Sequence, residues 1–323
     1  MIKSMNPLLT RRTALVGSLS AAAALGTTRL FGQAAADGRV PENEAHWARL
    51  GVSLEGKTAL VTGSTDGLGR EVARQLGALG AFVIVHGRNA ERGEEVVRLV
   101  RDAGGDAVLY RADFGSLAEI SAFADRVLER HDRLSLLINY AAATGARERR
   151  VSADGHELAF AVNYLSHFLL THRLLPLLQT SAPSRIVNVS SMGQAPIDFD
   201  DVMFERNYDS ADAYRRSKLA QIMFTIDLAA TLDPAEITVT AVHPARSMNT
   251  TRVIGGGFEP LSTVEEGAEA VMQLAVSPEV AGVTGVYFNQ LVEAPANAQA
   301  YDAEARQKLW ALSVELTGTG GRS

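Results

Sequence analysis

From Lys57 onward, the chain alternates short apolar runs rich in β-branched residues with longer segments of helical periodicity. Seven runs have the length and composition of strands: KTALVTG, AFVIVHG, DAVLYRA, RLSLLINY, SRIVNVS, EITVTAVHP and TGVYFNQ. Strands that alternate with helices in this way form parallel sheets covered by helices on both faces. The pattern therefore predicts an α/β fold with a Rossmann-type, doubly wound parallel sheet of about seven strands.

The predicted elements belong to one domain. After residue 40 there is no internal repeat, low-complexity tract or Pro/Ser-rich linker, so we expect a single catalytic domain over residues 54–323, preceded by an extension at 37–53. Long connections are predicted at residues 192–212 and 246–262. In open α/β sheets, long loops that follow strands lie at the carboxyl edge, where ligands bind.

Composition narrows the possible partners. The chain is 46% hydrophobic and 21% charged, as expected of a soluble globular protein. Its formal net charge is −6, and the first 36 residues hold four basic residues and no acid, so the remainder is more negative still. Such a surface repels phosphate backbones, and no nucleic-acid partner is expected. The absence of cysteine excludes disulfides and thiolate chemistry. The histidines show no compelling metal-ligand spacing, so no metal site is predicted.

Residues 1–36 resemble a signal peptide. Arg11 and Arg12 precede an apolar stretch over residues 13–26, and small residues follow in GQAAADG. The stretch is shorter than the roughly 18 residues of a membrane-spanning helix. The paired arginines resemble a twin-arginine export signal. We therefore expect export to the periplasm or cell envelope, with no stable membrane span after processing. The alternative is a cytoplasmic enzyme with an N-terminal extension.

A glycine-rich turn follows the first predicted strand. Gly63 would make the tight turn, Gly67 would let the backbone approach a pyrophosphate, and Gly69 would let the next helix pack close to its strand. The phosphates would then lie at the helix N-terminus, where amide groups and the helix dipole favour anions. The spacing is G-x3-G-x-G rather than the general G-x-G-x-x-G, and a plain strand-to-helix turn remains the alternative.

Arg88 indicates which dinucleotide is bound. It stands about 20 residues beyond the turn, where a site for NAD presents an acid to the ribose. Because a planar guanidinium suits a 2′-phosphate, the sequence favours NADP(H) over NAD(H). Asp66 opposes this prediction, since its charge would repel a nearby 2′-phosphate. A solvated residue at a strand end is the alternative for Arg88.

Tyr214 and Lys218 lie four residues apart in a predicted helix, so the phenol and the ammonium share one face. A free phenol, with a pKa near ~10, is a poor base at neutral pH, but a partly desolvated ammonium nearby favours the phenolate. The pair is thus suited to moving a proton to or from a hydroxyl or carbonyl oxygen. Ser190 and Ser191 end a predicted strand at the same edge. An ordinary surface pair and a turn serine remain the alternatives.

Together these motifs resemble the short-chain dehydrogenase/reductase family. Between about Leu54 and Gln290, a series of residues occurs in the family's order and approximate spacing: the glycine turn, Asp113, Asn139, Asn163, Ser191, Tyr214 with Lys218, and His243-Pro244. The runs AVNYLSHFLLTHRLLPLL and YRRSKLAQIMFTIDLA resemble the retinol dehydrogenase-like branch.

The resemblance implies a role for each residue. Tyr214 would be the general acid/base, Lys218 would bind the nicotinamide ribose and lower the tyrosine pKa, and Ser191 would orient the substrate oxygen, with Ser190 as the fallback. Asn163 would hold a water in the proton relay. The cofactor-binding residues would be Gly63, Ser64, Thr65, Gly67, Leu68, Gly69, Arg88, Asp113 at the adenine, Asn139 beside the central strand, Tyr214 and Lys218.

Two motifs depart from the family's pattern. The usual Asn-Asn-Ala-Gly is Asn139-Tyr140-Ala141-Ala142, and the usual Pro-Gly is Pro244-Ala245. Alanine does not take glycine's backbone angles freely. These departures concern the geometry around the nicotinamide and the substrate loop, and they leave the catalytic residues intact.

The sequence thus predicts an enzyme, an NADP(H)-dependent oxidoreductase that interconverts an alcohol and an aldehyde or ketone. The substrate would be a small apolar or moderately polar molecule, and family habit suggests a homo-oligomer. One alternative is a catalytically silent nucleotide-sensing module, which would lack a reacting residue. Another is an NAD-dependent nucleotide-sugar epimerase or dehydratase, which would carry a substantial C-terminal sugar-binding domain.

Overall fold

The computed structural model describes residues 46–47, 49–144 and 147–319. The predicted export signal at residues 1–36, and residues 37–45 of the predicted extension, lie outside these ranges. Among the described residues, no helix has both the length and the apolar character needed to cross a membrane.

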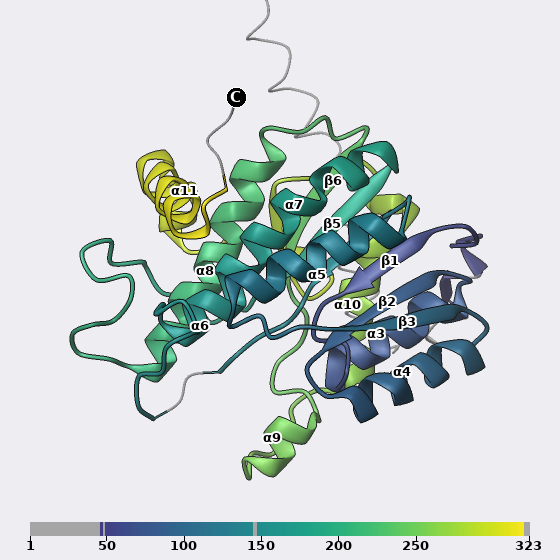
Figure 1. Cartoon of the computed structure of the whole chain (residues 1–323), viewed down its shortest axis with the longest axis horizontal. Helices are drawn as coiled ribbons and strands as arrows, with labels where there is room; N and C mark the ends of the chain where they lie inside the picture. The colour runs from purple at the N-terminus through teal and green to yellow at the C-terminus, as the bar shows by residue number, and fades with distance from the viewer. Residues whose placement is uncertain (1–45, 48, 145–146, 320–323) are drawn as a thin grey trace, which may run out of the picture. The chain divides into compact units, whose positions relative to one another are not determined.

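Eight strands form one sheet in the order β3-β2-β1-β4-β5-β6-β7-β8. Figure 1 shows β3, β2 and β1 side by side at one end of it. Their bounds are β1 Thr58–Val61, β2 Phe82–Gly87, β3 Asp106–Arg111, β4 Leu136–Asn139, β5 Ser184–Val189, β6 Ile237–His243, β7 Val286–Asn289 and β8 Val292–Glu293. The first seven are parallel, and β8 pairs antiparallel with β7. Strand order reverses beside β1, as in doubly wound folds, so the predicted fold is confirmed. The eighth strand goes beyond the predicted seven because two residues are too short to show a pattern.

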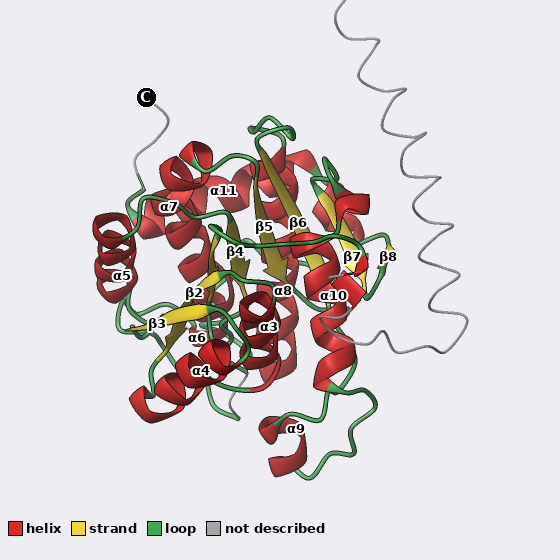
Figure 2. Cartoon of the chain, turned by 90° about the vertical axis from the view of Figure 1, so that its right-hand side faces the viewer, coloured by secondary structure: helices red, strands yellow, loops and turns green. Residues whose placement is uncertain are grey.

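Helices cover both faces of this sheet. Helix α3 packs against α4 and α10, whereas α5 packs against α7, and α8 lies on β5 and β6 (Figure 2). The long helices are α3 Gly67–Ala78, α4 Ala90–Asp102, α5 Leu117–Arg130, α7 Ser166–Thr180, α8 Ser210–Ala229, α10 Val264–Val276 and α11 Ala303–Thr317. Short helices are α6 Leu158–Phe160, the π-helix η1 Ala161–Leu165, α9 Thr251–Gly255, and the 3-10 turns η2 Pro278–Val280 and η3 Ala298–Tyr301.

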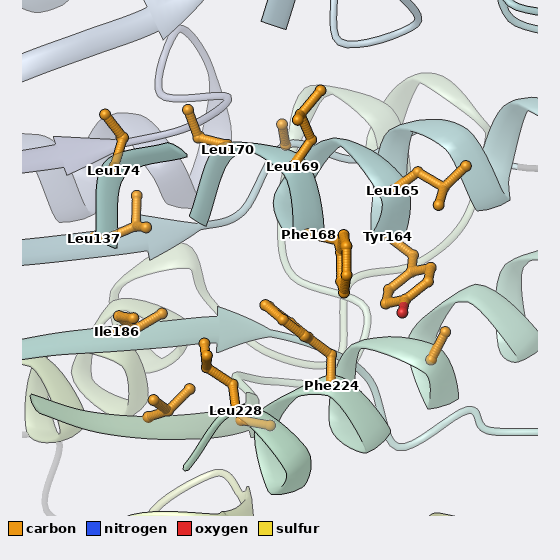
Figure 3. Close-up of a cluster of buried hydrophobic side chains, with 14 of the residues drawn as sticks. Leu137, Tyr164, Leu165, Phe168, Leu169, Leu170, Leu174, Ile186, Phe224 and Leu228 are labelled. Atoms are coloured by element: carbon orange, nitrogen blue, oxygen red, sulfur yellow. The ribbon is translucent and has the colours of Figure 1, made fainter. Parts of the chain in front are cut away.

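The largest group of buried apolar side chains lies between the sheet and the helices α5, α7 and α8. Leu137 of β4 and Ile186 of β5 pack in one cluster with Phe168 of α7 and Phe224 of α8 (Figure 3). β4 and β6 are buried at every position, which is expected of strands covered on both faces. This packing holds the carboxyl ends of the central strands in fixed positions.

Two long loops leave that carboxyl edge, as predicted. One connects β5 to α8 over residues 190–209, and the other connects β6 to α10 over residues 244–263 and contains α9. Helix α8 begins at Ser210, where Asp209 caps it by accepting the main-chain N–H of Asp212. The first loop therefore ends slightly earlier than predicted.

Candidate active site

The turn between β1 and α3 requires its three glycines. Gly63 has φ +68°, and a Cβ there would lie 2.8 Å from the main-chain Cα of Ala141. Gly67 has φ +50°, in the left-handed region that favours glycine. A Cβ at Gly69 would lie 2.7 Å from the carbonyl oxygen of Gly63 and 2.8 Å from the ring of Tyr140. The turn is therefore packed too closely for side chains at Gly63 and Gly69, and its backbone conformation at Gly67 favours glycine.

The N-terminus of α3 carries a capping carboxylate. Asp66 accepts the main-chain N–H of Gly67 at 2.8 Å. Its other oxygen lies 3.2 Å from the guanidinium of Arg92 on α4, and Thr251 of α9 also contacts the carboxylate. The charge of Asp66, which we expected to repel a 2′-phosphate, thus has a cation beside it. Arg92 is a residue that sequence reasoning missed.

His86, at the end of β2, holds the turn from the inside. Its ring Nδ1 accepts the main-chain N–H of Gly63 at 3.0 Å, and the main-chain N–H of His86 donates to Ser64 Oγ at 3.0 Å. Nε2 lies 3.2 Å from the carbonyl oxygen of Ala112 and therefore carries the ring proton. Burial lowers the pKa of His86 to about 4. The ring is thus neutral at physiological pH and retains the lone pair that holds Gly63.

The remaining predicted cofactor residues fall into two groups. Ser64 and Leu68 are fully buried, and Thr65 packs over Gly87. Arg88, by contrast, has a side chain 76% exposed and lies 3.7 Å from Asp113. Both stand at the open side of the turn.

Asn139 ends β4 beneath the turn. Its amide donates to Asn188 on β5 at 2.8 Å and to Thr171 on α7 at 3.1 Å. These contacts tie β4 to its neighbours. Asn139 therefore links β4 to β5 and α7 beside the turn.

These features fit a dinucleotide. Glycines without room for a Cβ, followed by a helix N-terminus, form a backbone surface that a pyrophosphate can approach. Arg88 and Arg92 supply positive charge beside it. The ribose and adenine would then lie toward Arg88 and Asp113.

Tyr214 and Lys218 lie in the first half of α8, which docks at the end of β5. The Lys218 ammonium is 5.8 Å from the centre of the Tyr214 ring. It donates to the carbonyl oxygen of Val189 at 2.9 Å, and Ser190 Oγ donates to the carbonyl oxygen of Lys218 at 2.7 Å. Lys218 is only 3% exposed. The ammonium is therefore buried and hydrogen-bonded, with the Tyr214 ring nearby.

The two adjacent serines have different roles. The Ser190 hydroxyl donates its proton to a main-chain carbonyl oxygen of α8, that of Lys218. Ser191 Oγ accepts the N–H of Gly193 at 3.0 Å, and the side chain of Arg215 on α8 also lies near that glycine. Accepting this bond leaves the Ser191 proton available to donate. Ser191 is therefore the better candidate for binding a substrate oxygen.

Asn163 lies in the π-helix η1, an irregular turn that often marks functional sites. Its side-chain oxygen accepts the N–H of Ala143 at 2.7 Å, and its amide donates to Ser217 Oγ at 2.9 Å. Ser217 in turn donates to the carbonyl oxygen of Tyr214. The structure thus brings Asn163 beside the same turn of α8 as the Tyr-Lys pair.

A buried polar chain lies behind Lys218, and sequence reasoning missed it. Gln221, one helical turn from Lys218, contacts the ammonium, and His167 of α7 contacts Gln221. The three- and seven-residue spacings of Gln221 from Lys218 and Tyr214 place all three on one helical face, which was the available signal. For His167, whose partners are distant in sequence, no local signal exists.

The loop after β6 has its positive φ angle at a serine rather than at Ala245. Ala245 has no positive φ; instead Ser247, two residues later, takes φ +46°. Met248 packs inward toward Gly267 of α10. Ile254, Phe258 and Leu261 are 58%, 72% and 62% exposed. The loop thus presents apolar side chains to solvent, and its residue Thr250 lies close to Gly67.

Comparison with known proteins identifies the family. The short chain dehydrogenase family matches residues 57–253. The chain is 38% identical to human retinol dehydrogenase 14 over 294 residues, which cover 82% of this chain and 87% of that protein. An uncharacterised protein from Mycobacterium paratuberculosis has the same fold, with TM-score 0.68, 28% identity, and 83% and 95% of the two chains covered. The Pseudomonas aeruginosa RhlG/NADP active-site complex gives TM-score 0.61 and 28% identity, with 73% and 95% covered.

The chain therefore belongs to the short-chain dehydrogenase/reductase family and is similar to its retinol dehydrogenases. As a member it is an oxidoreductase that acts on CH–OH groups with a nicotinamide cofactor.

Proposed function

We propose that this protein is an NADP(H)-dependent oxidoreductase that interconverts an alcohol and an aldehyde or ketone, with Tyr214 as the general acid/base. One observation carries the proposal: the Lys218 ammonium is buried and anchored 5.8 Å from the Tyr214 ring. A buried positive charge at that distance favours the phenolate over the phenol. The pair can therefore exchange a proton near neutral pH.

The chain's residues divide the work as follows. In the reducing direction, the Tyr214 phenol donates its proton to the substrate's carbonyl oxygen, and Ser191 donates a hydrogen bond to the same oxygen. In the oxidising direction, the phenolate accepts the hydroxyl proton. Asn163 holds the α8 turn that carries Tyr214, through Ser217. The bound nicotinamide supplies or accepts the hydride.

Two observations support NADP(H) over NAD(H). Arg88 is exposed at the end of β2, where a 2′-phosphate would come, and its planar fork suits that group. Arg92 lies beside Asp66 and offsets its charge. The RhlG complex, a structural relative, contains NADP.

The substrate is best sought among apolar alcohols and carbonyl compounds. Ile254 and Phe258 expose apolar surface on the loop after β6, and the relatives that match over most of their length are retinol dehydrogenases. A hydrophobic alcohol or aldehyde would cover that surface.

The proposal is tested with purified protein, NADPH and a panel of carbonyl compounds, with cofactor absorbance as the readout. We expect turnover by the wild type, and a drop of at least about 100-fold in kcat for Tyr214→Phe, because general acid/base catalysis contributes about that much. Ser190→Ala serves as a control beside Ser191→Ala, which should lose more activity. Full activity in Tyr214→Phe would refute the assignment.

We also propose that residues 1–36 direct export. Fusing them to a reporter that is active only outside the cytoplasm, with Arg11 and Arg12 changed to Lys as control, tests this. Export that is insensitive to the substitution would argue against a twin-arginine signal.

A further inference from the structure

A series of buried polar side chains connects Lys218 to Thr62, which follows β1 at the start of the glycine-rich turn. Lys218 Nζ donates to Gln221 Oε1 at 2.8 Å, and Gln221 Nε2 lies 3.0 Å from Nδ1 of His167. Nε2 of His167 lies 3.4 Å from Thr62 Oγ1, a long contact. None of these four residues is more than 3% exposed. Such a set of buried polar groups is costly unless its members satisfy one another.

The positive charge at one end orients the first two bonds of this series. An ammonium only donates, so Gln221 must turn its oxygen toward Lys218 and its amide toward His167. Nδ1 of His167 then accepts, and its proton resides on Nε2, facing Thr62. Thr62 Oγ1 in turn accepts the main-chain N–H groups of Tyr140 and Ala141. The polarity of the Lys218–Gln221 and Gln221–His167 bonds therefore follows from the charge of Lys218.

His167 stays neutral in this setting. Burial, with the charge of Lys218 as the second cause, lowers its pKa to about 3, although the main-chain carbonyl of Asn163 acts in the opposite direction. The His167 ring therefore contacts the main chain of Asn163 directly. It is linked to Lys218 only indirectly, through Gln221.

Two neutral groups accept hydrogen bonds from the Lys218 ammonium. Val189 offers a carbonyl oxygen and Gln221 an amide oxygen. A carboxylate in either place would hold the ammonium as firmly, but it would also cancel the positive charge that the phenolate of Tyr214 needs.

We propose that Gln221 and His167 are positioning residues that hold the Lys218 ammonium beside Tyr214 through neutral hydrogen bonds, fixing its charge in place without cancelling it. This inference rests on the proposed function, in which Lys218 stabilises the Tyr214 phenolate. His167 does not contact the ammonium; its role is to accept the hydrogen bond that orients the Gln221 amide.

Three variants separate charge from packing. Gln221→Glu keeps the shape and an acceptor for Lys218 but adds a negative charge. Gln221→Leu removes both hydrogen bonds. His167→Leu removes the partner that orients Gln221. Gln273 of α10 is also buried, and its amide donates to the carbonyl oxygen of Leu291. Gln273→Glu and Gln273→Leu are therefore matched controls for the same substitutions away from the site.

The first readout is the phenolate absorbance of the cofactor-free protein during a pH titration. The difference between each protein and its Tyr214→Phe counterpart isolates Tyr214. We expect Gln221→Glu and Gln221→Leu to raise the apparent pKa of Tyr214 by about one unit or more, and His167→Leu by less, because each weakens the effect of the ammonium. The Gln273 variants should leave it unchanged.

The second readout is the pH dependence of kcat for alcohol oxidation with NADP+. Its midpoint should move upward in step with the titration, while KM for the alcohol changes little. If Gln221→Leu does not fold, Gln221→Glu still decides the question, because it preserves volume and the contact with Lys218. Unchanged midpoints in Gln221→Glu and His167→Leu would overturn the inference. Undiminished activity in Tyr214→Phe would instead overturn the proposed function.

Discussion

The turn after β1 and the loop after β6 meet at the same edge of the sheet but are built differently. In the turn, the positions of Gly63 and Gly69 leave no space for a Cβ, and His86 binds the main chain from within. In the loop, Phe258 is 72% exposed and a Cβ on Gly255 would meet no atom within 4 Å. The first region thus has one available shape, whereas the second has room to accept different partners. This difference suggests why the cofactor class is easier to infer than the substrate.

The largest effect should come from adding a methyl group to the turn. Gly69→Ala places a Cβ 2.7 Å from the carbonyl oxygen of Gly63, so we expect a loss of roughly 2–4 kcal/mol in unfolding free energy and of most cofactor binding. Denaturant unfolding and NADPH fluorescence titration measure both. Gly255→Ala, on the open loop, is the control and should cost nothing or stabilise α9 slightly. Equal effects of the two substitutions would remove the contrast between the regions.

Low pH should reduce the free energy of unfolding because it protonates His86, which accepts the Gly63 N–H. The pKa of His86 is lowered from 6.5 to about 4, so the unfolded chain takes up a proton before the folded one does. The free energy of unfolding should therefore fall as the pH drops from 6.5 to about 4, and level off below that, by up to ~3 kcal/mol for this residue.

His86→Asn isolates that contribution, because an Asn side-chain oxygen can still accept the Gly63 N–H while it cannot titrate. Its unfolding free energy, measured by denaturation at a series of pH values, should show a shallower slope between pH 6.5 and 4. A slope identical to that of the wild type would mean that other groups cause the acid sensitivity.

Cofactor preference should respond to Arg88. Removing the guanidinium in Arg88→Ala should weaken NADPH binding roughly 10-fold while leaving NADH nearly unchanged, because charge-assisted hydrogen bonds to a phosphate are worth about 1.5–3 kcal/mol. Fluorescence titration with both cofactors measures the ratio. Arg98→Ala, an exposed arginine on α4, is the control. If Arg88→Ala leaves the preference for NADPH over NADH unchanged, Arg92 becomes the candidate for contact with the 2′-phosphate.

The smallest effect on stability is expected in the loop after β6. Phe258→Ala removes an exposed ring, so the unfolding free energy should change by less than about 0.5 kcal/mol. KM for apolar substrates should nevertheless rise several-fold, and KM for small polar ones should not. Leu128→Ala, at an exposed position of α5, controls for loss of apolar surface. An unchanged KM would place the substrate elsewhere along the carboxyl edge.

The sequence could predict whatever depends on residues close together in the chain. The buried strands appear as apolar runs, and the Tyr214–Lys218 spacing places both residues on one helical face. The contacts of His86 with Gly63 and of Gln221 with His167 span 23 and 54 residues, so no local pattern indicates them. The distinction between Ser190 and Ser191 depends on which hydroxyl meets the α8 main chain, and that appears only when helix and strand are packed.

The two ends of the sheet bear on how copies of this protein can associate. An open strand edge invites another chain to add to it, and very short or charged edge strands discourage this. Here β8 has two residues, and β3 at the opposite end begins and ends with the charged residues Asp106 and Arg111. Neither edge offers a long apolar template for continuous pairing. The short and charged edge strands discourage aggregation through the sheet. We therefore expect that any homo-oligomer forms through helical surfaces.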